Sequence, residues 1–131
     1  MMNLSTIYNL LSDLNDLCET LDSEYNLNNG GCCYAAAVIS QELEKRDIPF
    51  LFGFTNESND VYGAYHYVIY ALGYIINQCD SNDDEFRFIS MDSNDIGEMY
   101  YNGNWNECYS KRWNLIVLTK IRALFKKYDN N

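Results

Sequence analysis

The chain has few residues that break regular structure and few that bind polyanions. Its 131 residues include one proline, and nine lysines and arginines stand against nineteen acidic residues, which gives a net charge of -10. No basic cluster is larger than the pairs Lys111-Arg112 and Lys126-Lys127. A chain with this balance repels polyanions, so we expect neither nucleic acid nor an anionic membrane among its partners.

The sequence also lacks the usual signals for export and for metal binding. Its first residues have neither the basic nor the apolar region of a secretory signal, and the longest apolar stretch, Val68 to Ile76, is too short to span a bilayer. The five cysteines form no C-x-x-C pair, which argues against a disulfide framework and a zinc site. We therefore expect a cytoplasmic protein with reduced thiols and no metal or other cofactor.

Hydrophobic spacing predicts a single α+β domain over residues 1–131. Helical periodicity covers residues 4–21 and 113–128, and residues 32–46 predict a helix whose first half is apolar on all sides. The predicted strands cover residues 49–55, 65–71, 74–79, 87–91 and 99–102. We expect N-terminal helices, a buried central helix packed on a small antiparallel sheet, and a C-terminal amphipathic helix.

One cysteine stands where a thiol is expected to be reactive. The sequence Asn29-Gly30-Gly31-Cys32 places Cys32 at the N-terminus of the predicted central helix. The helix dipole and the free backbone N–H groups there lower the pKa of a thiol and can hold a developing oxyanion. The two glycines would let a substrate approach the backbone closely. We therefore predict Cys32 as a nucleophile, with its neighbour Cys33 in the core.

The single histidine, His66, is the candidate general base for this thiol. Such a base needs a third group that fixes its orientation. If Leu72-Gly73 is a two-residue hairpin turn, the strand register puts Asn77 on the same face as His66. A bulge or a longer turn would favour Gln78 or Asp80 instead. We predict Asn77 as the orienting residue and Asp80 as the alternative. Cys79 is expected to pack, although it could face His66 as a second thiol.

A cysteine that opens a helix, a histidine in a strand and an asparagine in the next strand resemble the papain-like cysteine peptidase and transglutaminase-like superfamily. The likeness is closest to small phage and bacterial members. Its matches cover roughly residues 26 to 80 and lie at Asn29-Gly30-Gly31-Cys32, His66-Tyr67-Val68-Ile69 and Gly73-Tyr74-Ile75-Ile76-Asn77.

This resemblance implies thiol chemistry on an amide, as in a peptidase, amidase, deamidase or acyl transferase. It also implies that a side-chain amide several residues before Cys32 helps to form the oxyanion hole. Asn26 is the candidate for that role, and Asn28 and Asn29 are its rivals.

Two functions remain open from the sequence. The first is a cysteine-dependent hydrolase or acyl transferase that acts on a peptide, isopeptide or side-chain amide of a protein or peptide substrate. The alternative is a catalytically inactive acidic binding or inhibitor protein, such as a phage protein that blocks a host factor. The reactivity of Cys32 toward thiol reagents distinguishes the two.

Overall fold

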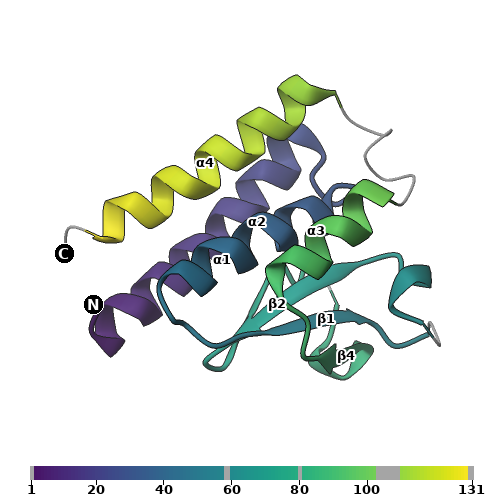
Figure 1. Cartoon of the computed structure of the whole chain (residues 1–131), viewed down its shortest axis with the longest axis horizontal. Helices are drawn as coiled ribbons and strands as arrows, with labels where there is room; N and C mark the ends of the chain where they lie inside the picture. Colours follow the sequence, from purple (N-terminus) through teal and green to yellow (C-terminus); the bar gives the residue numbers. More distant parts are fainter. Residues whose placement is uncertain (1, 58–59, 80, 103–109, 130–131) are drawn as a thin grey trace.

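A computed structural model describes residues 2–57, 60–79, 81–102 and 110–129 (Figure 1). Within these residues the chain forms four α-helices and a four-stranded antiparallel sheet, which confirms the predicted α+β class. The helices are α1 (Leu4–Tyr25), α2 (Cys32–Lys45), α3 (Ser93–Asn102) and α4 (Lys111–Asp129). The strands are β1 (Leu51–Thr55), β2 (Tyr67–Ala71), β3 (Tyr74–Ile76) and β4 (Phe86–Ile89).

The strands are ordered β3-β2-β1-β4 across the sheet. Ala71 pairs with Tyr74, so Leu72 and Gly73 form the two-residue turn that the sequence predicts. Both turn residues have positive φ, 48° and 91°, as a type I′ hairpin requires. The strand after this turn is shorter than predicted, because Asn77 adopts a left-handed φ of 69° and β3 ends at Ile76.

The helix α1 starts and ends at asparagines. The side chain of Asn3 accepts a hydrogen bond of 2.8 Å from the backbone N–H of Thr6, and this satisfies one of the free donors of the first turn. Asn26 ends the helix with a left-handed φ of 55°. The stripe of α1 that faces the core consists of Leu10, Leu11, Leu14, Cys18 and Leu21.

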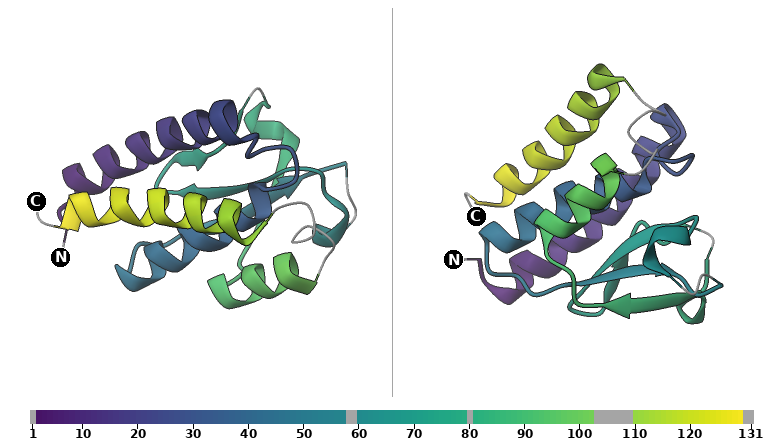
Figure 2. Two further views of the ribbon diagram at one scale, coloured as in Figure 1. Left: turned by 90° about the horizontal axis from the view of Figure 1, so that it is seen from above. Right: turned by 45° about the vertical axis from the view of Figure 1, so that its right-hand side comes forward.

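The helix α2 is the central helix of the fold. It packs against β2 on one side and against α3 and α4 on its other sides, whereas α1 covers β3 and also contacts α4 (Figure 2). The antiparallel pair α1 and α4 is joined near both ends of α4. Trp113 donates to the carbonyl of Tyr25 at 2.9 Å, and the Tyr128 hydroxyl bonds the carboxylate of Asp13. The buried central helix and the C-terminal amphipathic helix are therefore confirmed.

The strand predicted at residues 99–102 is wrong, because these residues lie in α3. Ile96, Met99 and Tyr100 are buried at helical spacing against α2, so burial in tertiary structure decides their conformation. Residues 103–109 lie outside the described residues. None of the helices in the described ranges is long and apolar enough to cross a bilayer.

Candidate functional site

Cys32 is the first residue of α2, as the sequence predicts, but the residue is only 3% exposed. Burial raises the pKa of Cys32 to about 11, although the backbone N–H groups of Tyr67, of Cys33 and of Cys32 itself act in the opposite direction. The expected lowering of the pKa at the helix N-terminus is therefore outweighed by the loss of solvation. The resting thiol is protonated at neutral pH.

The two glycines before Cys32 have structural reasons to be glycine. Gly30 has a φ of 105°, a left-handed conformation that side chains disfavour. A Cβ on Gly31 would collide with the indole of Trp113 and would lie 2.8 Å from the carbonyl oxygen of Leu27. The space beside Gly31, which we expected to admit a substrate, is occupied by Trp113.

His66 lies just before β2 and is 7% exposed. Its Nε2 is 2.8 Å from the backbone carbonyl oxygen of Asn77. Because a carbonyl can only accept, Nε2 carries the proton of the neutral ring and Nδ1 is left as the acceptor. Burial lowers the pKa of His66, although the Asn77 carbonyl and Asp22 act against this. The neutral form, which a general base requires, is therefore favoured.

Asn77 does reach His66, but through its backbone and not through the side chain that we predicted as the orienting group. Its side-chain amide pairs with that of Asn28 in two reciprocal hydrogen bonds of 3.1 and 2.8 Å. Its N–H donates to the side chain of Asn15 at 2.9 Å. These bonds hold the left-handed residue in place and fix the carbonyl that accepts from His66. The alternative orienting residue, Asp80, lies outside the described residues.

Of the asparagines before Cys32, it is Asn28 that joins this cluster. Asn26, the predicted oxyanion residue, is the C-cap of α1, and its N–H donates to the carbonyl of Asp22. Asn28 donates its side-chain N–H to the sulfur of Cys79 at 2.6 Å. Sequence spacing offered Asn26, Asn28 and Asn29 together, and only the conformation of the loop separates them.

Cys79 is exposed, so its expected role in packing is wrong. Its φ is 60°, so the backbone leaves the strand geometry that would have directed the side chain inward. Its sulfur lies 3.8 Å from the side-chain oxygen of Asn77, at the outer edge of the amide cluster.

The head of α2 and the ends of β2 and β3 bring Cys32 and Asn77 together. Both residues line a small internal void, with Tyr67 and Val68 among its other walls. One of the N–H groups that favour the Cys32 thiolate belongs to Tyr67, which follows His66 directly in the chain. The void is too small to admit water, so the thiol is closed off in this conformation.

Within the described residues, no group of three or more His, Cys, Asp or Glu side chains is arranged to hold a metal ion. Comparisons of the chain with protein-family models, with curated proteins and with solved structures gave no match. The function therefore has to be argued from the geometry of the site.

Proposed function

We propose that this protein is a cysteine-dependent hydrolase or acyl transferase that acts on an amide of a protein or peptide substrate. Cys32 is the nucleophile, His66 is the general base and Asn77 is the residue that orients His66. The observation that carries the proposal is the 2.8 Å bond between Nε2 of His66 and the carbonyl of Asn77. This bond fixes the ring tautomer, and it leaves the other nitrogen free to take a thiol proton.

The chemistry follows from this tautomer. As the sulfur of Cys32 attacks the carbonyl carbon of the substrate, the thiol proton moves to Nδ1 of His66. The Asn77 carbonyl stabilises the imidazolium that forms, and free N–H groups at the head of α2 stabilise the oxyanion. The ring then protonates the leaving amine as the C–N bond breaks. Water or a second amine releases the acyl group from the resulting thioester.

The burial of Cys32 determines when the thiol loses its proton to His66. With a thiol pKa of about 11, the resting site holds S–H rather than a preformed thiolate. Proton transfer to His66 is therefore coupled to the attack, and the rate should follow the protonation of His66 rather than that of the free thiol.

Alkylation of Cys32 by iodoacetamide, located by mass spectrometry, tests this proposal. In the folded protein we expect the rate at Cys32 to rise with pH as His66 loses its proton, and because burial lowers the pKa of His66 this rise should lie below the ordinary imidazole pKa of 6.5. His66→Ala should slow alkylation at neutral pH by about 10²-fold, the usual contribution of a general base. The proposal fails if Cys32 reacts equally fast in both proteins.

Asn77→Gly provides the matched control for the orienting group. Glycine keeps the backbone carbonyl and tolerates the left-handed φ of residue 77. If the carbonyl orients His66, this variant should keep most of the reactivity of Cys32. If the side-chain amide were the orienting group, the loss should approach that of His66→Ala.

The second candidate function is a catalytically inactive acidic binding or inhibitor protein. The observation that favours it is the closed thiol, because Cys32 is 3% exposed beside a void without room for water. In such a protein Cys32 packs the core, and the net charge of -10 is directed at a basic protein partner. Alkylation of Cys32 only after unfolding, with or without His66, would support this function.

A further inference from the structure

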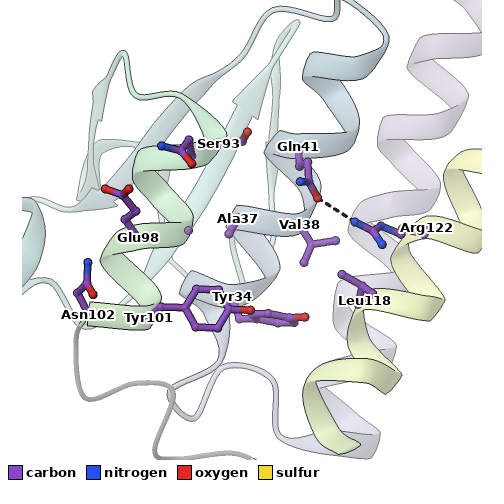
Figure 3. A pocket seen from close by; sticks show the side chains of 12 residues that line it. Tyr34, Ala37, Val38, Gln41, Ser93, Glu98, Tyr101, Asn102, Leu118 and Arg122 are labelled. Atoms are coloured by element: carbon purple, nitrogen blue, oxygen red, sulfur yellow. Dashed lines mark hydrogen bonds between the residues drawn. The ribbon is translucent and has the colours of Figure 1, made fainter. Parts of the chain in front are cut away.

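A second cavity lies away from Cys32, between α2, α3 and α4. It has a volume of about 440 Å³, within the range of small-molecule sites (Figure 3). The helix α2 contributes one face to it, with Tyr34, Ala37, Val38 and Gln41 three or four residues apart. Cys32 and Ala36 of the same helix line the void beside the sheet. One face of α2 therefore lines this cavity, and another lines the void beside Cys32.

The charged group over the apolar floor of this cavity is Arg122 of α4. Its Nη2 donates to Gln41 at 2.9 Å, as Figure 3 shows, and its Nε lies 3.3 Å from a carboxylate oxygen of Glu42 without a hydrogen bond. Glu42 is also paired with Lys45 and Arg46, so its charge is balanced without Arg122. Among the described residues, the guanidinium makes one hydrogen bond and one ion pair. Because its side chain is 39% exposed, its other Nη N–H groups keep donors for a ligand, whereas the buried Nε does not.

The rest of the cavity suits an apolar or aromatic body. Ala37, Val38 and Leu118 line it, and Figure 3 shows Tyr34 and Tyr101 together across the cavity from Gln41. Burial raises the pKa of the Tyr34 hydroxyl to about 12, and the neighbouring Tyr101 acts in the same direction.

The wall that α3 contributes to the cavity is open at Gly97. A Cβ built on Gly97 would meet no atom within 4 Å, so the α3 side of the cavity has room for a ligand. This empty space also gives a position at which the cavity can be filled by substitution.

The charge of α4 favours an anion at Arg122, although the molecule as a whole is acidic. Six of the nine lysines and arginines lie on α4, against one acidic residue, Asp129. The acidic residue on the α3 side of the lining, Glu98, is exposed and hence well solvated. A guanidinium above an apolar floor is the usual partner of a planar carboxylate.

We propose that this cavity binds a small amphipathic carboxylate. The carboxylate pairs with Arg122, and the apolar or aromatic body lies along Ala37 and Val38 toward Tyr34. The proposal does not depend on the thiol chemistry at Cys32.

Titration of the ¹⁵N-labelled protein with N-acetylphenylalanine, followed by backbone amide shifts, tests the proposal. The matched probe is N-acetylphenylalanine amide, which has the same body without the charge. The acid should shift residues of α2, α3 and α4 around the cavity, and the amide should bind about tenfold more weakly or worse. Equal binding of the two probes, shifts elsewhere, or no shifts at millimolar acid would overturn the proposal.

Two sets of variants test the volume of the cavity and the charge of Arg122 separately. Gly97→Leu should fill the cavity and abolish binding, whereas Gly97→Ala should leave binding nearly unchanged. If Gly97→Leu does not fold, Ala37→Leu fills the same space from α2. Arg122→Gln should weaken binding of the acid to the level of the amide and leave the amide unaffected. Unchanged binding of the acid in the filled variants, or in Arg122→Gln, would also overturn the proposal.

Discussion

The buried His66 should make the free energy of unfolding depend on pH in mild acid. Burial lowers its pKa below the ordinary value of 6.5, so the unfolded chain binds a proton more readily than the folded one. The stabilisation is complete above pH 6.5 and is lost as the pH falls through the folded pKa. We expect the free energy of unfolding from urea titrations to decrease from pH 7 to 5, by at most about 1.4 kcal/mol per pH unit for a single group.

His66→Gln provides the control for this prediction, because the chain has no other histidine. Its free energy of unfolding should be nearly flat between pH 7 and 5. Glu42 and Asp129 also have lowered pKa values, but as carboxylates they lose their stabilisation only as the pH falls below about 4.5. An equal decrease in wild type and variant between pH 7 and 5 would contradict the assignment to His66.

Single residues of the candidate site were predictable where chemistry alone selects them. The lone histidine and the cysteine at the head of a helix needed no knowledge of the fold. Cys32 opens α2 as predicted, whereas His66 lies just before β2 and not within the strand. The atom of Asn77 that bonds to His66 was not predictable, because strand alternation assumes that the chain stays extended. Asn77 leaves the strand with a positive φ, so its carbonyl reaches the ring and its side chain turns to Asn28.

At the scale of the element, Gly73 and Gly97 form a matched pair. A Cβ on either glycine would meet nothing within 4 Å, so substitution by alanine tests the backbone alone. Gly73 sits in the β2–β3 turn with a φ of 91°, and Gly73→Ala should cost roughly 1 kcal/mol or more. Gly97 lies in α3, and Gly97→Ala should stabilise the protein by up to about 1 kcal/mol. Urea unfolding measures the change in the free energy of unfolding for each variant. A change of the same sign in both variants would contradict this interpretation.

A helix or strand could be predicted where neighbouring residues in the sequence determine its conformation. The Leu72-Gly73 turn between two apolar runs gave the hairpin and its register. The helix α3 was missed because Gly97 and several polar residues weaken its local propensity. Its conformation is decided by packing of Ile96, Met99 and Tyr100 on α2, a long-range contact that no window of sequence contains.

At the scale of the whole molecule, α2 couples the sheet to the other helices. It packs on β2, α3 and α4, so neither side of the core is complete without it. We expect one calorimetric unfolding peak whose van't Hoff and calorimetric enthalpies agree. Phe125→Ala on α4 and Ile69→Ala on β2 each remove a buried side chain, at a cost of about 2–5 kcal/mol, and both should lower the temperature of that one peak. A second peak in either variant would show that the two sides unfold separately.

Trp113 links the two candidate sites of the molecule. Its indole fills the space beside Gly31, directly before Cys32, and its ring centre is 6.3 Å from that of Tyr34 in the wall of the second cavity. The emission of an indole responds to its immediate surroundings, so this one side chain is a built-in fluorophore for both places. With Trp105 replaced by phenylalanine, the tryptophan emission of the chain would come from Trp113 alone, and substrate or carboxylate binding could be followed without an added dye.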